Sequence, residues 1–211
     1  MNKNLADITI VVDKSGSMHS VRSDAEGGIN SFLSDQAKQD GSANITLVEF
    51  STDWRFVYHA APVSSSMRYT LSPSGGTALL DAVGNAINDT GRRLAAMKEK
   101  DRPGVVTFVI VTDGQENSSR EFTRAKIKEM IEHQQRVYDW KFMFLGANQD
   151  AFAEAASIGI DLSGVAKYKD HNTYSAYNMA SGKMSGLRMA SMSGNEVKLS
   201  FSPDELKSLD K

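Results

Sequence analysis

The sequence predicts an α/β protein with a three-layer, doubly wound (Rossmann-like) fold, in which helices cover both faces of a mainly parallel sheet with one antiparallel edge strand. Three observations indicate this fold. Short runs of β-branched and aliphatic residues alternate along the chain with stretches of helical periodicity. Such alternation requires right-handed crossovers, which place parallel strands in one sheet. Two adjacent strand-like runs, at residues 44–51 and 55–63, predict the antiparallel edge.

The first half of the chain begins with a strand. Residues 7–12 (DITIVV) form a β-branched run that is typical of a strand buried on both faces. A helix is expected next and should end near Gly41, because apolar residues recur at helical spacing at Ala25, Ile29, Phe32, Leu33 and Ala37. The two runs of the predicted hairpin, NITLVEFS and RFVYHAAPV, then flank residues 52–54.

The middle of the chain predicts a helix, a strand and a further helix. The loop SPSGGT at residues 72–77 precedes a helix whose apolar positions run from Leu79 to Leu94. Residues 105–112 (VVTFVIVT) form the most hydrophobic stretch, and we expect them to be the central strand. Ser118 and Glu121 have the spacing of a capping box, so the third helix is expected to start there and to continue to about Gln135.

The last third predicts a buried strand at residues 140–146 (WKFMFLG), with Asn148 or Asp150 capping a short helix after it. Residues 164–170 (GVAKYKD) form a weaker strand pattern. From Tyr174 the chain is polar, rich in methionine and moderately helical, and the segment SPDE at residues 202–205 predicts one more helix start. We expect residues 1–190 to form one domain and residues 191–211 to form a C-terminal tail with a short helix, docked or partly flexible.

The composition argues against several classes of function. The 211 residues carry a net charge of −2, which disfavours a broad nucleic-acid-binding surface. No run approaches the ~18 apolar residues of a membrane span, and the N-terminal segment is too short and too acidic for a secretory signal. The chain has no cysteine, which rules out disulfides and thiolate metal sites. We therefore expect a cytoplasmic protein that binds neither nucleic acid nor membranes.

Two aspartates mark the ends of predicted buried strands. Asp13 ends the first strand and Asp113 follows the most apolar one. A carboxylate beside buried aliphatic surface is costly unless it is paired, and Lys14 should point away from Asp13 in an extended segment. Because ligands of parallel sheets bind beyond the carboxyl ends of the strands, a divalent cation there would offset the charge of both aspartates. The hydroxyls of Ser15, Ser17 and Thr77 would add hard oxygen donors suited to Mg²⁺ or Mn²⁺, with Ca²⁺ as an alternative.

The motifs DKSGS (Asp13–Ser17), GGT (ending at Thr77) and TDG (around Asp113) together resemble von Willebrand factor A (vWA) domains with an intact metal-ion-dependent adhesion site. The overall length and the segment LGANQDAFAEAASIGI resemble small free-standing bacterial or phage members. The resemblance implies that Ser15, Ser17 and Thr77 coordinate the cation directly or nearly so, with Asp13 and Asp113 acting partly through water. It also implies a non-enzymatic protein-binding module, in which an Asp or Glu carboxylate of a protein partner completes the cation's coordination.

Other readings of these motifs are weaker. Each motif alone is typical of a turn or a helix cap. An EF-hand loop from Asp13 to Asp24 has Met18 where the loop needs glycine, and a strand precedes it instead of a helix. An aspartyl phosphotransferase would need a second acid where Ser15 stands. In a third alternative the cation is structural, and partners bind the methionine-rich C-terminal part, which contains Met179, Met184, Met189 and Met192.

Several further residues are expected near the site. Asp81, one turn after Thr77, would either support the cation from behind or act on the helix dipole, and we favour the dipole. We expect four polar residues on the rim of the site: His19, Glu116, Asn117 and Asn148.

Overall fold

The protein is described by a computed structural model that covers residues 1–147 and 150–210. Its centre is a six-stranded sheet with the order β3-β2-β1-β4-β5-β6. The strands are β1 (Asn2–Asp13), β2 (Ser42–Phe50), β3 (Trp54–Pro62), β4 (Pro103–Thr112), β5 (Lys141–Gly146) and β6 (Val165–Lys167). All neighbouring pairs are parallel except β2 and β3, which are antiparallel. The predicted fold class, with its antiparallel edge strand, is confirmed.

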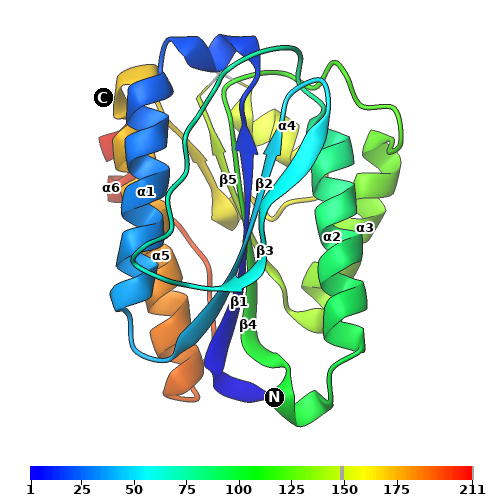
Figure 1. Ribbon diagram of the computed structural model, residues 1–211, viewed down its shortest axis with the longest axis vertical. Coiled ribbons are helices and arrows are strands. Elements are labelled where there is room, and N and C mark those ends of the chain that lie inside the picture. Colours follow the sequence, from blue (N-terminus) through cyan, green and yellow to red (C-terminus); the bar gives the residue numbers. More distant parts are fainter. Residues whose placement is uncertain (148–149, 211) are drawn as a thin grey trace.

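Helices cover both faces of this sheet (Figure 1). Helices α1 (Arg22–Lys38), α5 (Thr173–Met192) and α6 (Pro203–Leu209) lie on one side, and α2 (Leu79–Ala95), α3 (Arg124–Tyr138) and α4 (Ala151–Ser157) lie on the other. Between them, the described residues also form four short 3-10 turns: η1 (Gly16–His19), η2 (Glu99–Asp101), η3 (Leu162–Gly164) and η4 (Asp170–Asn172). Across the described ranges, no helix combines the length and apolar character needed to cross a bilayer.

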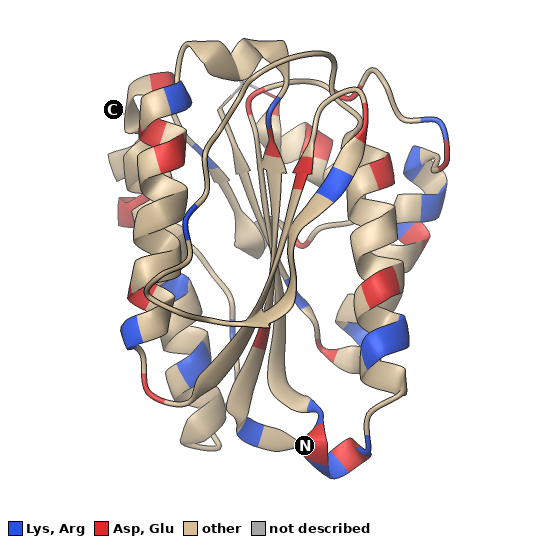
Figure 2. Cartoon of the chain, viewed as in Figure 1, with Lys and Arg blue, Asp and Glu red and all other residues tan. Residues whose placement is uncertain are grey.

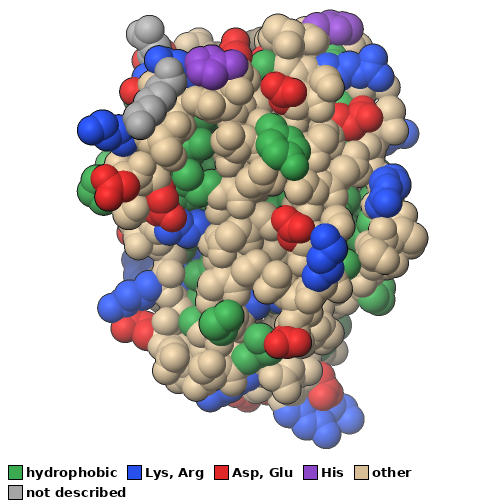
Figure 3. Space-filling view, turned by 90° about the vertical axis from the view of Figure 1, so that its left-hand side faces the viewer, with side chains coloured by type: hydrophobic (Ala, Val, Ile, Leu, Met, Phe, Trp, Pro, Cys, Tyr) green, Lys and Arg blue, Asp and Glu red, His purple; other side chains and the backbone are tan. Residues whose placement is uncertain are grey.

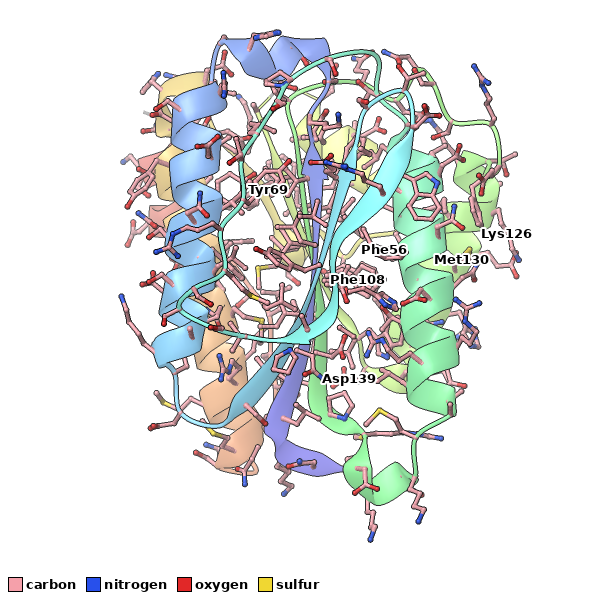
Figure 4. The ribbon with its side chains drawn as sticks, in the orientation of Figure 1. Phe56, Tyr69, Phe108, Lys126, Met130 and Asp139 are labelled. Atoms are coloured by element: carbon pink, nitrogen blue, oxygen red, sulfur yellow. The ribbon has the colours of Figure 1, made fainter. Side chains whose placement is uncertain are left out.

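Two hydrophobic cores hold the layers together, one on each face of the sheet. Alternate residues of β1 supply both, with Ile10 facing the core below α1 and α5 and Val11 facing the core below α2 and α3. Figure 4 labels members of each core, with Tyr69 on the side of α1 and Phe108 and Met130 on the side of α2 and α3. Because β1 and β4 are buried on both faces, their carboxyl ends are held firmly at one edge of the sheet.

A buried ion pair connects α2 to β1 on the face of the sheet that α2 and α3 cover. Asp7 of β1 is only 1% exposed, and Arg93 of α2 donates two hydrogen bonds to its carboxylate, at 2.7 and 2.9 Å. This forked geometry satisfies both carboxylate oxygens with one guanidinium group. The pair therefore ties α2 to the middle of the sheet, away from the strand ends that carry the motifs.

The observed starts of α3 and α6 can be compared with the two predicted capping boxes. The predicted start at residues 202–205 is confirmed, because Ser202 and Glu205 form a capping box. The predicted start at Ser118 and Glu121 is wrong, because α3 begins at Arg124 and Thr123 is its cap. Backbone N–H groups of residues 118–122 donate instead to the carboxylates of Glu116 and Asp81.

The remaining elements differ in detail. The weaker strand prediction at residues 164–170 shortens to β6, and Asp150 occupies the N-cap position of α4, whereas Asn148 lies outside the described residues. The division predicted after residue 190 falls within α5, which continues to Met192, and it stays a prediction. An ion pair between Lys183 and Glu205, at 2.7 Å, links α5 to α6.

Charged groups are distributed unevenly over the elements. Figure 2 shows acidic residues at the carboxyl ends of β1 and β2, at the same edge as the predicted cation site. The face formed by α1 and α5 instead carries scattered charges of both signs, with some hydrophobic side chains between them (Figure 3). The three sequence motifs lie at this same edge, where Figure 2 also shows basic residues.

Candidate metal site at the carboxyl edge of the sheet

The first and third motifs meet through a chain of hydroxyl and carboxylate groups. Asp13 is the last residue of β1, and Ser15 and Ser17 lie in the turn that follows it. The Oγ atoms of Ser15 and Ser17 are 2.9 Å apart, and Ser17 Oγ donates a 2.7 Å hydrogen bond to Asp113 Oδ1. Residues 96 positions apart in the sequence are therefore in direct contact.

The second motif reaches the same point. A Cβ atom placed on Gly114 would lie 3.1 Å from Thr77 Oγ1 and 3.6 Å from both Asp13 Oδ2 and Ser17 Oγ. Oxygens of the first and second motifs thus border one position on the third motif, and Asp113 joins them through its hydrogen bond with Ser17. Glycine at position 114 keeps this space free of a side chain. The structure therefore brings Asp13, Ser15, Ser17, Thr77 and Asp113 together.

Asp13 is the most deeply fixed group of the cluster. It is fully buried, its Oδ1 accepts the backbone N–H of Ser15 at 2.7 Å, and its Oδ2 accepts the hydroxyl of Thr112 at 2.6 Å. Burial raises the pKa of this carboxyl, and these hydrogen bonds partly oppose the rise. Thr112, which the sequence analysis did not single out, orients Asp13, and its position directly before Asp113 at a strand end was the available signal.

Asp113 is partly exposed, and its surroundings disfavour the charged form of its carboxyl group. Burial, together with the nearby charge of Asp13, raises its pKa from 3.8 to about 6, although the hydrogen bond from Ser17 works in the opposite direction. Within the described ranges, neither Asp13 nor Asp113 pairs with a Lys or Arg side chain within 4.0 Å. Two carboxylates therefore lie near one another with hydroxyl groups as their side-chain partners.

The donor set fits a hard divalent cation. Two carboxylates and three hydroxyls supply only oxygen, which suits Mg²⁺, Mn²⁺ or Ca²⁺ and disfavours softer metals. The described residues contain no group of three or more His, Cys, Asp or Glu side chains that could hold a metal, so a cation here would need hydroxyl groups among its donors. A cation there would relieve both the burial cost and the mutual repulsion of Asp13 and Asp113.

The loop that carries Thr77 is built for close backbone contacts. Gly75 adopts a φ of +76°, and a Cβ atom there would come within 2.7 Å of Thr52 Oγ1. Its carbonyl accepts the N–H of Gly16 at 3.1 Å, which joins the second motif to the first. Only glycine combines this left-handed conformation with the available space.

The rim predictions have mixed outcomes. His19 is exposed at the end of η1. Asn117 is exposed too, but its Oδ1 accepts the backbone N–H of Thr77 at 2.9 Å. Glu116 accepts the backbone N–H of Leu80 in α2, and Asp81 accepts the N–H of Arg120 in the loop before α3, so Asp81 does more than interact with its own helix dipole.

Two histidines and a tryptophan outside this cluster contact neighbouring side chains. His59 contacts the Asp89 carboxylate at 2.7 Å, and the His133 ring packs against Tyr138. Trp54 packs edge-on against Phe56 on its own strand. Of the four methionines, Met184 is buried in the core and Met189 is 62% exposed, while Met179 and Met192 are partly buried.

This fold and this arrangement of hydroxyl and carboxylate groups define a class of domains, and sequence comparison names it. Residues 7–198 match the family model of the von Willebrand factor type A domain, so the chain belongs to that family. The family is known for metal-dependent adhesion and protein interaction. A search of curated proteins found no match.

Solved structures show the same fold. The von Willebrand factor type A protein from Catenulispora acidiphila has a TM-score of 0.61 and 15% identity, over 89% of this chain and 42% of that one. Proximal thread matrix protein 1 from the mussel byssus, with a zinc-occupied MIDAS motif, has a TM-score of 0.57 and 18% identity, over 83% of this chain and 46% of that one. Manganese-loaded Plasmodium vivax TRAP has a TM-score of 0.58 and 14% identity, over 83% of this chain and 73% of that one. The chain thus spans less than half of the first two proteins.

Proposed function

We propose that this protein is a divalent-cation-dependent protein-binding module. The observation that carries the proposal is the convergence of the three motifs beside Gly114, where oxygens of the first two motifs border one space and Ser17 is hydrogen-bonded to Asp113. Ser15, Ser17 and Thr77 would hold the cation directly or nearly so, and Asp13 and Asp113 would hold it partly through water. Mg²⁺ is the first choice, with Mn²⁺ and Ca²⁺ as alternatives. Zinc in the mussel protein and manganese in the Plasmodium protein support a divalent cation in this type of site.

The bound cation would supply a positive charge that attracts an Asp or Glu carboxylate of a protein partner. The chain's own residues determine how strongly, because three of the five donors are neutral hydroxyls that leave part of that charge uncompensated. Ser17 and Asp113 are the groups of the cluster that reach the surface, so the partner would approach from their side. The proposal keeps the cytoplasmic location and the small bacterial or phage type expected from the sequence.

Two alternatives have less support. In a phosphotransferase, Asp13 would have to attack a phosphate, but this carboxylate is fully buried and both of its oxygens accept hydrogen bonds. Recruitment through the methionine-rich part would require an exposed methionine face, but of its four methionines Met184 lies in the core, two are partly buried and Met189 alone is largely exposed.

The cation is tested by thermal denaturation with EDTA and with added Mg²⁺, Mn²⁺ or Ca²⁺. A cation at 100 times its Kd adds about 2.7 kcal/mol to stability. For a domain of this size we expect a Tm increase of roughly 5–10 °C, reversed by EDTA. Ser17→Ala and Thr77→Ala should lose most of this increase. Ser20→Ala is the matched control, because its hydroxyl bonds to the carbonyl of Ser17 and should leave the response intact.

The partner is tested by affinity capture from the native host with the wild-type protein and Ser17→Ala. A partner retained by the wild type in Mg²⁺, and lost with EDTA or with Ser17→Ala, supports the proposal. A partner that binds equally well in EDTA would contradict it and favour the structural-cation alternative. Competition by a peptide rich in Asp and Glu, but not by its Asn and Gln counterpart, identifies the carboxylate as the group recognised.

A further inference from the structure

The loop after Asp113 and the first turn of α2 are joined by two carboxylates, each of which accepts hydrogen bonds from backbone N–H groups of the other segment. Glu116 lies in the loop, and its Oε2 accepts the backbone N–H of Leu80 in α2 at 2.9 Å. Its Oε1 accepts the N–H groups of Ser118 and Ser119 at 2.9 and 2.8 Å, and Ser119 Oγ donates to Oε2 at 2.7 Å. One carboxylate therefore joins the loop to the start of the helix.

Asp81 makes the reciprocal contacts from α2. It is 6% exposed, and its Oδ2 accepts the N–H of Arg120 at 2.7 Å. Its Oδ1 accepts the N–H groups of Glu121 and Phe122, each at 2.9 Å. In return, the N–H of Asp81 donates to Ser119 Oγ at 3.1 Å. We call Glu116, Asp81 and Ser119 together the loop clamp.

The local sequence explains why these contacts form. The N-cap position of α2 is Ala78, which has no side chain able to accept a hydrogen bond. The first N–H groups of a helix need acceptors from elsewhere, and an anion near them is also favoured by the helix dipole. Glu116 and Ser119 supply these acceptors through space. The capping group that the sequence near α2 lacks thus comes from the loop of the third motif.

The loop clamp lies between two of the candidate metal donors. Thr77 is three residues before Leu80, and Asp113 is three residues before Glu116. The carbonyl of Thr77 also accepts the N–H groups of Asn117 and Ser118, at 3.0 and 3.2 Å. The backbone of the second motif is therefore bonded directly to the loop that carries the third.

We propose that Glu116 and Asp81 are positioning residues that fix the Thr77 hydroxyl relative to the Asp113 carboxylate before the cation binds. The inference rests on the proposed function, because it concerns the affinity of that same site. Neither residue needs to contact the cation. Their carboxylates restrict the motion of two loops that would otherwise have to become ordered when the cation binds. Substituting groups that orient metal ligands typically lowers the affinity for the metal 10–100-fold.

The test compares Mg²⁺ affinity, measured by isothermal titration calorimetry, in Glu116→Gln, Asp81→Asn and the wild-type protein. Both substitutions keep the shape of the side chain but replace one acceptor oxygen with an NH₂ group. We expect each to raise the Kd by about 10–100-fold. Asp89→Asn is the control, because Asp89 also belongs to α2 and binds His59 and Arg92 instead of the loop. It should lower the Tm and leave the Kd unchanged.

The possible results separate the two proposals. A Kd within twofold of wild type in both variants, with a lower Tm, would overturn the positioning role and leave the metal site standing. A wild-type protein that binds none of Mg²⁺, Mn²⁺ and Ca²⁺ would overturn the proposed function and this inference together. If Asp81→Asn fails to fold, Ser119→Ala takes its place, because it removes one bond to each carboxylate-bearing segment. Faster hydrogen exchange at the amides of Asn117 and Ser118 should accompany the weaker binding.

Discussion

Replacing Asp113 with asparagine should stabilise the cation-free protein while removing its response to the cation. The substitution keeps an oxygen that can accept the 2.7 Å hydrogen bond from Ser17. It removes a negative charge that is partly buried and close to Asp13. Without a cation that charge costs stability, whereas with a cation it would contribute to binding. The two effects therefore have opposite signs in the two conditions.

The size of the stabilisation follows from the pKa of the Asp113 carboxyl. Burial and the charge of Asp13 raise it from 3.8 to about 6. In a dry site this rise would correspond to ~3 kcal/mol at neutral pH. Asp113 is partly exposed, so solvent screening reduces the cost, and we expect about 1 kcal/mol. For a domain of this size, that gives a Tm increase of roughly 2–4 °C in EDTA.

The raised pKa of Asp113 makes the stability of the cation-free protein depend on pH in the opposite direction to that of a typical acidic residue, whose pKa is lowered by folding. Between about pH 4 and 6 the folded protein holds a proton on Asp113 that the unfolded chain has released. The stability of the cation-free wild type should therefore fall as pH rises through this window, and the loss is complete above about pH 6. In Asp113→Asn this slope should be smaller. It should not vanish, because burial raises the pKa of Asp13 in the same direction.

The assay is urea denaturation in EDTA at several values from about pH 4.5 to 7.5, repeated at the highest value with Mg²⁺. The reasoning predicts a more stable variant in EDTA at neutral pH and a variant without a Mg²⁺ response. A variant that is less stable than the wild type in EDTA, or that keeps the wild-type slope, would refute the assignment of a charge cost to Asp113. A variant that is stabilised in EDTA but still responds fully to Mg²⁺ would remove Asp113 from the donor set.

Two further predictions concern the interior. Arg93→Met leaves the Asp7 carboxylate buried without its partner, so we expect a loss of about 3–5 kcal/mol in urea denaturation with an unchanged Mg²⁺ response; a loss below about 1 kcal/mol would show that the pair matters little. Tyr177→Phe removes a fully buried hydroxyl that has no hydrogen-bond partner among the described residues, so thermal melts should show a change between zero and about 1 kcal/mol of stabilisation. A clear destabilisation by Tyr177→Phe would mean that the hydroxyl is hydrogen-bonded in solution.

Local patterns predicted the elements whose structure depends on local interactions. The unbroken aliphatic runs of β1 and β4 indicated strands buried on both faces, which the two cores confirm. Ser202 and Glu205 form the capping box that their spacing predicted, since both partners belong to the same turn. Ser118 and Glu121 have the same spacing and do not cap a helix. There the amides of the segment are bound by Asp81, which lies about 40 residues away in the sequence.

The sequence could predict which loops meet at the candidate site, but not which side-chain atoms contact one another there. Parallel strands bring their carboxyl ends to one edge, so Asp13 and Asp113 were expected to be neighbours. The orienting role of Thr112 and the pairing of Asp7 with Arg93 depend on long-range packing geometry. No sequence spacing encodes which two side chains meet across a sheet or between a strand and a helix, because those contacts are set by how the layers pack.

The loop clamp and the raised pKa of Asp113 are linked. If Asp113 were free to move, it would turn away from Asp13 and towards water, because that lowers the cost of its charge. Glu116 lies three residues further on and binds the start of α2, so the loop that carries Asp113 is restrained close to Asp13. Hydrogen bonds remote from the proposed cation position thus maintain an arrangement that is unfavourable without a cation and would be favourable with one bound. Loosening the clamp should consequently weaken cation binding and also reduce the repulsion that Asp113→Asn removes, so the stabilisation produced by Asp113→Asn in EDTA should be smaller in a Glu116→Gln background.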